Sequence, residues 1–370
     1  MGDPKNLEFS VVATLTMTGE VDKTHQVVYR QVLPVLVCLG ILANGLCIVV
    51  LSRPRLRSAW VIRYFMVLAV SDLLVCVFYI PIITTINGCV FSSYNEARYF
   101  AHFGWSLVTF SQSVGTYVIV WLAMDRFMAV WTPRLYPRIQ KMPKFMWIRI
   151  VVTVVLCFLI HLEYMVHVKI SCVNDIDVIW TNETCPSHNN TLSNDVNCLN
   201  NTWVVTDAYH YMYKKNWHEI VRIFYALMVR WLPCSLMLVF NASLVVGVVK
   251  QRIRFPATKK RRSGEKALAI ITIAMTASYI ILTLPITIYL TYYAELLPNR
   301  CHCDYPYELF RHIGNTLQLL EHVLHILFLV TLNHKFRREL KILLHLEVRT
   351  KEGDYSTRDE GGAEIGSNLG

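Results

Sequence analysis

The sequence is short of charge. Only 17% of its 370 residues are Asp, Glu, Lys or Arg, whereas 54% are hydrophobic and the mean hydropathy is +0.38. A soluble domain usually has more charged residues, about 25%. The net charge of +10 would suggest nucleic-acid binding in a soluble protein. Here the basic residues lie in a few short segments between apolar runs. The composition therefore favours a membrane protein, and we expect no nucleic-acid partner.

Signatures of catalysis are also missing. The sequence has no phosphate-binding glycine loop, no catalytic triad pattern and no dedicated metal motif. Residues 1–28 are polar and mixed, without the basic segment and apolar core of a cleavable signal peptide. We therefore expect a protein that is not an enzyme and has no cofactor.

Seven apolar segments follow one another along the chain. Each reaches the roughly 20 residues that an α-helix needs to cross a hydrocarbon layer of about 30 Å. Backbone groups in lipid must be hydrogen-bonded internally, and no alternating barrel pattern is present. The sequence thus predicts an all-α membrane protein, a seven-transmembrane helix bundle over residues 29–332. The segments are 29–51, 61–86, 103–130, 147–168, 220–249, 267–292 and 310–332.

Lysine and arginine predict the orientation of this bundle. They gather in the connections after segments one, three and five, and again after segment seven. This pattern places those four parts of the chain in the cytoplasm. The connection after segment five is then a third intracellular loop, at about 250–266. Residues 1–28 and the second extracellular loop, about 169–219, are then outside. Glycosylation triplets in that loop agree, at Asn182, Asn189 and Asn200. A fourth triplet at Asn241 lies inside segment five and should be inaccessible. We expect a multi-pass plasma-membrane protein with an extracellular N-terminus.

The cysteines divide between the two environments. Five lie in apolar segments and six in the predicted outer loops. An oxidising compartment favours disulfides among the outer six over zinc binding by Cys301-His302-Cys303. Six cysteines permit about fifteen sets of three pairings, which leaves the connectivity open. The outer cysteines are Cys89, Cys172, Cys185, Cys198, Cys301 and Cys303.

After the last span, residues 333–346 predict a short amphipathic helix on the membrane surface. Phe336, Leu340, Leu343 and Leu344 share one face at helical spacing, and the other face is basic. The following residues, 347–370, are polar and rich in glycine, which predicts a disordered cytoplasmic tail.

Charged residues within the spans are the first candidates for function, because a charge in lipid is costly. Asp125 and Arg126 are adjacent at the end of segment three. Either the two neutralise each other at the membrane boundary, or Arg126 is a conformational lock that changes partners. Asp72 lies in the middle of segment two, where loss of hydration makes its charge costly.

These motifs resemble those of the rhodopsin-like G-protein-coupled receptors. The order and spacing carry the resemblance: Gly40 to Gly45 with Asn44, Leu68 to Asp72, Asp125-Arg126-Phe127, Pro233, Pro285 and Phe336-Arg337-Arg338. Several positions depart from the pattern. Ala101 stands where the family has a cysteine, Thr283 replaces a tryptophan, and residues 325–329 replace Asn-Pro-x-x-Tyr.

The resemblance implies an activation switch. Glu265 would be the resting partner of Arg126, and Pro285 would lie in the sixth helix. Asp72 and Asn44 would form a sodium or proton site. We hypothesise that a contact between His325 and Asp72 replaces the sodium-linked network, so that His325→Asn changes sodium sensitivity or the pH dependence of signalling. For His322 we favour packing with ordinary hydrogen bonds.

The resemblance also bears on the ligand. Segment seven has no lysine for retinal, and Val108 stands where amine receptors have an aspartate, so we expect a peptide. Phe127, Asn241 and Glu163-Tyr164 are similar to the branch that includes FMRFamide-type neuropeptide receptors. The ligand-facing candidates, from helix position, are Trp105, Thr109, Gln112, Arg230, Thr287, Tyr293, Arg311 and Asn315.

The expected function is a receptor that binds an extracellular peptide and activates a heterotrimeric G protein, with arrestin and a receptor kinase as further implied partners. Two alternatives stay open. One is a proton- or ion-linked transporter using Asp72, Glu321 and His325. The other is a receptor-like protein that does not couple.

Overall fold

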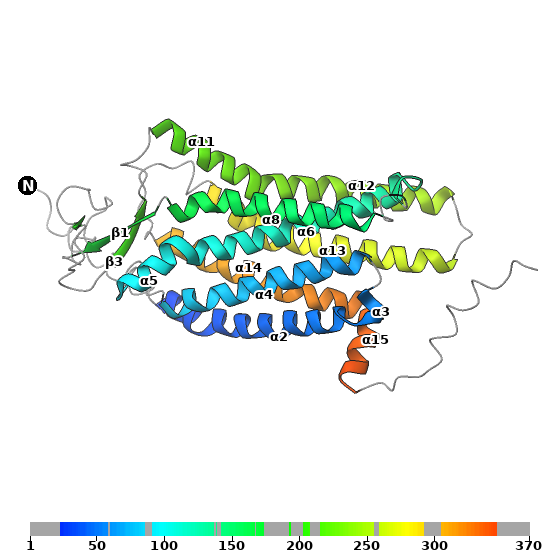
Figure 1. Cartoon of the computed structure of the whole chain (residues 1–370), viewed down its shortest axis with the longest axis horizontal. Helices are drawn as coiled ribbons and strands as arrows, with labels where there is room; N and C mark the ends of the chain where they lie inside the picture. Colours follow the sequence, from blue (N-terminus) through cyan, green and yellow to red (C-terminus); the bar gives the residue numbers. More distant parts are fainter. Residues whose placement is uncertain are drawn as a thin grey trace, which may run out of the picture.

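Seven long helices run side by side in the computed structural model of the chain (Figure 1). The structure describes residues 23–57, 60–85, 91–136, 138, 142–166, 168–173, 192–193, 203–207, 215–254, 259–291 and 305–345. Within these ranges seven helices are long and apolar enough to cross a membrane, which confirms the predicted fold class. The spans are Lys23–Leu51, Val61–Thr84, Tyr94–Trp131, Lys144–Leu162, Ile223–Gly247, Ala267–Tyr289 and Leu309–Leu332.

The first four spans are built from α2 (Leu33–Leu51), α4 (Trp60–Thr85), α6 (Trp105–Trp131) and α8 (Pro143–Val166). The short helix α3 (Pro54–Arg57) lies between α2 and α4, and α5 (Tyr94–Arg98) comes before the third span. The fifth span combines α11 (Lys215–Ala226) with α12 (Leu232–Arg254). The last two are α13 (Lys259–Leu290) and α14 (Tyr305–Leu332), followed by α15 (His334–Leu343).

Three of the spans contain a π-helical turn. These turns are η1 (Val28–Val32) before α2, η2 (Tyr99–Gly104) before α6, and η3 (Leu227–Trp231) between α11 and α12. Such turns are rare and often occur at functional sites. All three lie toward the end of the bundle that carries the β-sheet described next.

A small antiparallel sheet lies between α8 and α11 in the sequence, and the sequence patterns did not anticipate it. Its strand order is β2 (Leu192–Ser193), β1 (Val168–Val173) and β3 (Trp203–Asp207). Trp203 also exchanges two backbone hydrogen bonds with Phe91, of 2.8 and 2.9 Å. The sheet is thereby attached to the segment that follows α4. We call this the sheet end of the bundle and the opposite end, near α15, the α15 end (Figure 1).

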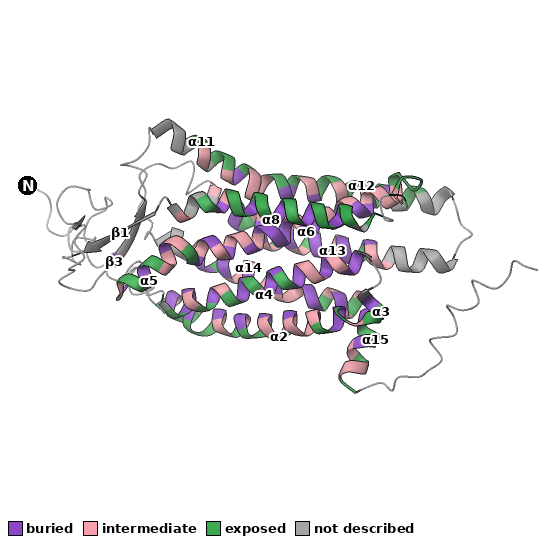
Figure 2. Ribbon diagram, in the orientation of Figure 1, coloured by how far each residue is buried: buried purple, intermediate pink, exposed green. Residues whose placement is uncertain are grey.

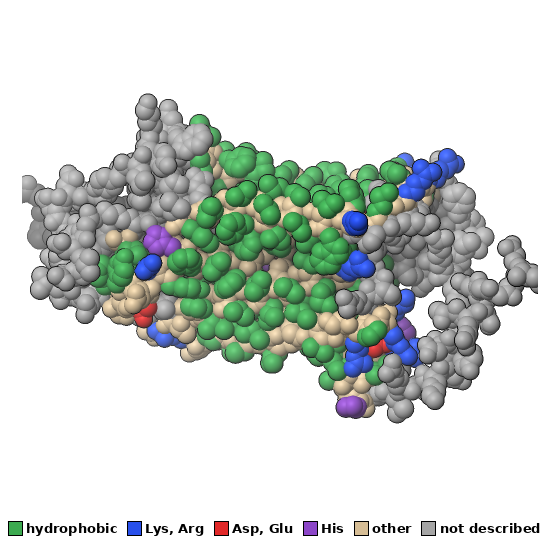
Figure 3. All heavy atoms as spheres, viewed as in Figure 1, with side chains coloured by type: hydrophobic (Ala, Val, Ile, Leu, Met, Phe, Trp, Pro, Cys, Tyr) green, Lys and Arg blue, Asp and Glu red, His purple; other side chains and the backbone are tan. Residues whose placement is uncertain are grey.

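The burial pattern is that of a bundle surrounded by lipid. Buried side chains line the contacts between helices, while large apolar side chains such as Leu42 and Ile281 are 70% and 69% exposed (Figure 2). In the space-filling view, hydrophobic side chains cover the middle of the bundle and most Lys and Arg lie near the α15 end (Figure 3). So wide an apolar surface is unusual for a soluble monomer but suits a lipid environment. The chain is thus a multi-pass membrane protein.

Glycine leaves room for close contacts between helices. A Cβ atom added at Gly40 of α2 would overlap the Cys76 side chain of α4, and one added at Gly314 of α14 would overlap Ile286 of α13. Small residues at such contacts let membrane helices pack tightly.

The short helix α15 follows the last span, and its place on the membrane surface stays a prediction. The Asn333 side chain caps it by accepting a hydrogen bond of 3.1 Å from the Phe336 backbone N–H. Phe336 is fully buried in the core, and Leu340 and Leu343 pack against the same core. Glu339 lies 3.4 Å from Arg53, so the helix is also attached to the connection after α2.

Candidate functional site

A cluster of charged and titratable side chains is buried between α4 and α14. Asp72 comes from α4, and Glu321, His322 and His325 come from α14; all four are at most 6% exposed. His322 Nδ1 lies 2.7 Å from Asp72 Oδ1, and His325 Nδ1 lies 2.6 Å from Asp72 Oδ2. Both oxygens of one carboxylate are therefore bound by imidazole nitrogens.

Glu321 completes the cluster from the same helix as the histidines. Its Oε1 lies 2.6 Å from His325 Nε2, which is ion-pair distance without the alignment of a hydrogen bond. Its Oε2 lies 3.4 Å from His322 Nδ1. The two ring nitrogens of His325 thus face two different carboxylates. An unpaired buried charge costs several kcal/mol, so this mutual neutralisation is what lets the four groups stay buried.

Helical spacing explains the arrangement. Residues three and four apart lie on the same face of a helix, which brings His322 and Glu321 beside His325. The expected contact between His325 and Asp72 is present. His322, for which packing with ordinary hydrogen bonds was expected, hydrogen-bonds the same carboxylate. The signal for this was the spacing of three residues between the two histidines.

Asn44 of α2 lies beside this cluster but binds backbone groups. Its Nδ2 donates to the Gly40 carbonyl at 3.0 Å and to the His322 carbonyl at 3.2 Å. Asn44 therefore connects α2 to α14 at the level of His322.

The sodium site implied by the resemblance does not fit these residues. Hard cations such as sodium are held by oxygen ligands. Here both Asp72 oxygens face imidazole nitrogens. This mixed set of nitrogen and oxygen donors is not the set that sodium prefers.

A second group of buried charges lies at the α15 end of α6. Asp125 Oδ1 accepts a hydrogen bond of 2.9 Å from Arg149 of α8. The guanidinium carbon of Arg149 also lies 4.3 Å from the Phe145 ring centroid and 5.3 Å from that of Trp121. Asp125 is fully buried and Arg149 is 8% exposed, so this is a buried ion pair with stacked aromatic rings.

Arg126 has a different partner. It donates a hydrogen bond to the Tyr136 hydroxyl, in the connection after α6, and is 5% exposed. The residue hydrogen-bonded to the Asp125 carboxylate is Arg149 of α8, and both interpretations of the Asp125–Arg126 pair stay predictions. Sequence reasoning missed both Arg149 and Tyr136. The available signal was an arginine close to the start of the fourth apolar segment.

Other residues assigned to the switch are only partly described. Pro285 lies inside α13. The Glu265 side chain lies outside the described residues, so its pairing with Arg126 stays a prediction. Asn241 of α12 donates to Thr276 of α13 at 2.7 Å, inside the bundle.

The sheet end holds the ligand-facing candidates. Asn315 donates a hydrogen bond of 2.8 Å to the Tyr29 hydroxyl. The Tyr29 ring stacks on His25 with centroids 4.7 Å apart and meets His312 edge-on at 5.2 Å. Arg311 precedes His312 in the same helix and is half-buried. The first and seventh spans therefore share a polar aromatic cluster at this end.

The other candidates have contacts elsewhere at this end or in their own helices. Trp105 packs edge-on against Tyr79, with centroids 5.8 Å apart, and the Thr109 hydroxyl donates to the Trp105 carbonyl of its own helix at 2.7 Å. Arg230 lies in η3, half-buried, with its guanidinium 5.9 Å from the Tyr225 ring. Of the three remaining candidates, Thr287 is buried and Tyr293 lies outside the described residues. The Nε2 atom of Gln112 is buried and has no hydrogen-bond partner among the described residues.

Sequence reasoning missed one further histidine. His161 of α8 is buried, with Nδ1 2.7 Å from the Cys157 carbonyl. Its Nε2 lies 3.3 Å from both the Ser113 and Tyr225 hydroxyls. It thereby links the third, fourth and fifth spans.

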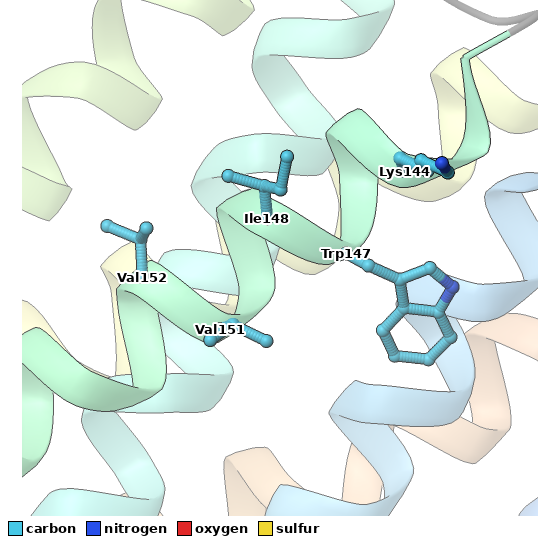
Figure 4. Close-up of a pocket in the computed structure, with 5 residues that line it drawn as sticks. All are labelled: Lys144, Trp147, Ile148, Val151 and Val152. Atoms are coloured by element: carbon cyan, nitrogen blue, oxygen red, sulfur yellow. The ribbon is translucent and has the colours of Figure 1, made fainter.

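A groove of about 430 Å³ lies on α8 and is not a ligand site for the bundle. Lys144, Trp147, Ile148, Val151 and Val152 line it, and Figure 4 shows that all five come from this one helix. Its apolar residues are 47% to 57% exposed, so the groove belongs to the lipid-facing surface.

Several predictions fall outside the described residues. These are the three glycosylation sites and five of the six outer cysteines; Cys172 lies in β1, and its side chain is not described. The cysteines of the spans, Cys38, Cys47, Cys76, Cys157 and Cys234, are unbridged.

Comparison with known proteins shows which family the chain resembles. The family model of the serpentine-type seven-transmembrane chemoreceptor Srw matches residues 31–347. The chain is also 23% identical over 306 residues to a probable G-protein coupled receptor of Caenorhabditis elegans. That match covers 80% of this chain and 64% of the relative, so the chain spans less than two thirds of the relative's length. Neither match supports the FMRFamide-type branch in particular. The chain belongs to the Srw family of serpentine seven-transmembrane G-protein-coupled chemoreceptors.

Proposed function

We propose that this receptor binds an extracellular peptide at the sheet end and activates a heterotrimeric G protein at the α15 end. One observation carries the second part: Arg126 is held by the neutral hydroxyl of Tyr136, while Asp125 is bound to Arg149. Arg126 can leave its partner without separating an ion pair. Its release would present a guanidinium at the cytoplasmic mouth of the bundle.

The energy required is within reach of a ligand. A hydrogen bond to a charged group contributes about 1.5–3 kcal/mol. A ligand shifts such an equilibrium only by its difference in affinity for the two states. A preference of about tenfold to 150-fold for the released state would therefore suffice, at about 1.4 kcal/mol per factor of ten.

The sheet end supports a peptide as the ligand. Val108, where an amine receptor has its aspartate, is fully buried and apolar. Helix α14 contains no lysine that could hold retinal. The end offers instead an amide and a hydroxyl at Asn315 and Tyr29, and a cation at Arg230. These groups suit the carbonyls and carboxylates of a peptide. Membership of the FMRFamide-type branch, and arrestin and a receptor kinase as partners, belong to this proposal.

A second ligand class follows from the family's description as chemoreceptors. A small external chemical would use the same end of the bundle. We favour the peptide because the candidate groups come from several spans, which suits a ligand that extends across this end.

The test is nucleotide exchange on a panel of G proteins, with the receptor in membranes, against amidated peptides and against small polar chemicals. We expect exchange with a peptide, lost in Arg126→Ala and kept in Arg134→Ala, whose side chain is exposed on the same connection. Exchange with small chemicals alone would overturn the peptide assignment. An Arg126→Ala receptor that still exchanges would overturn the switch, and ion flux without exchange would favour the transporter.

A further inference from the structure

The buried cluster between α4 and α14 has the composition of a metal site. One ligand atom from each of Asp72, His322 and His325 lies within 4.8 Å of the others. We infer that this cluster binds a transition-metal ion of the zinc type, with these three residues as ligands and Glu321 as the carboxylate behind His325.

The donor atoms match that class of ion. Imidazole nitrogens and carboxylate oxygens bind Zn²⁺ at about 2.0–2.2 Å, usually with tetrahedral geometry. Bonds of that length place neighbouring ligand atoms about 3.3 Å apart. The two Nδ1–Oδ separations are now 2.7 and 2.6 Å. Small rotations of the two rings and the carboxylate, opening each separation by roughly 0.6 Å, would admit the ion.

Glu321 supplies the second feature of such a site. A histidine that binds a metal commonly gives its other ring N–H to a carboxylate, which fixes the tautomer and the ring orientation. His325 places its two nitrogens in a similar way, with Nδ1 toward Asp72 and Nε2 at ion-pair distance, 2.6 Å, from Glu321 Oε1.

The charges also balance. Asp72 and Glu321 are two buried carboxylates, and a divalent cation with two neutral imidazoles neutralises both. Buried charges are tolerated when they are paired or bind metal. The ion would replace the hydrogen-bond protons that now lie between the rings and the carboxylates. It would join α4 to α14, and Asn44 would extend the connection to α2 through the His322 carbonyl.

The experiment uses the full-length receptor purified in detergent from zinc-supplied cells, so that the ion can enter during folding. Metal content is measured on the wild type and on His322→Asn, His325→Asn and Glu321→Gln. Co²⁺ is then titrated after chelation, with visible absorption as the readout. His161→Asn is the matched control, because this buried histidine of α8 lies outside the cluster. Folding of each variant is followed by size-exclusion chromatography.

We expect one zinc ion per wild-type receptor and a Co²⁺ spectrum of nitrogen and oxygen ligands. Glu321→Gln should weaken binding by about tenfold to 100-fold, and each histidine variant by at least that much. The control should bind as the wild type does. A folded wild-type receptor that binds neither ion would overturn the inference. Equal binding by the wild type and both cluster-histidine variants would overturn it as well.

Discussion

Asp125 of α6 and Arg149 of α8 form a buried ion pair, with Asp125 Oδ1 and an Arg149 guanidinium nitrogen 2.9 Å apart. Arg126, the sequence neighbour of Asp125, is bonded to the Tyr136 hydroxyl. The two charged residues of the motif therefore have different hydrogen-bond partners.

Removal of Arg149 should destabilise the receptor strongly. Arg149→Met leaves the Asp125 charge buried without its partner, which costs about 3–5 kcal/mol. The measurement is thermal unfolding in detergent. The control is Arg134→Ala, at an exposed position, which should change stability by less than about 0.5 kcal/mol. The double variant Asp125→Asn with Arg149→Met should lose less than the sum of the two single losses, and additive losses would contradict the pair.

The contacts of Asp72 with the histidines should also be coupled. Asp72→Asn and His325→Asn should each cost about 1.5–3 kcal/mol, because each removes a hydrogen bond to a charged group. The double variant should lose about 1 kcal/mol less unfolding free energy than the sum of the two single losses. Unfolding is measured with a chelator present, so that the result does not depend on a bound ion. Losses of unfolding free energy that simply add in the double variant would show that the contact between Asp72 and His325 does not contribute to stability.

Gly314 should tolerate no side chain. An added Cβ would overlap Ile286 of α13, so Gly314→Ala should cost about 1–3 kcal/mol through overpacking. Gly45→Ala is the control, since no other atom lies within 4 Å of an added Cβ there. The amount of folded receptor on the cell surface reports the difference. Equal amounts for both variants would contradict the close contact of α13 with α14.

The orientation can be tested through glycosylation. Asn182→Gln, Asn189→Gln and Asn200→Gln should each remove one glycan, seen as a mobility shift that a glycosidase abolishes. Asn241→Gln should cause no such shift, because this amide bonds Thr276 within the bundle. Absent glycans, together with accessibility of residues 250–266 on intact cells, would contradict the predicted orientation.

The apolar runs were enough to predict the seven spans, because span length and hydrophobicity are local properties of the sequence. The contact of His325 with Asp72 was also predictable, since both lie in the middle of their spans. The pairing of Asp125 with Arg149 was not. It depends on how α8 is rotated about its own axis, which no periodicity in the segment specifies.

The sheet escaped prediction for a related reason. Its strands β1 and β3 are short, and a long stretch of sequence separates them, so their pairing is not a local property. The contact of His322 with Asp72 could have been expected from its spacing of three residues from His325, because residues three apart share a helix face. Glu265 as the partner of Arg126 stays a prediction.

The most direct test of the account is basal nucleotide exchange by G proteins with the receptor in nanodiscs. Tyr136→Phe removes the hydroxyl that holds Arg126 and should raise the basal rate by about tenfold or more, the equivalent of 1.5–3 kcal/mol. Adding Arg126→Ala to that variant should abolish the increase. A basal rate that is the same in the wild type and Tyr136→Phe, or an increase that persists without Arg126, would contradict the account.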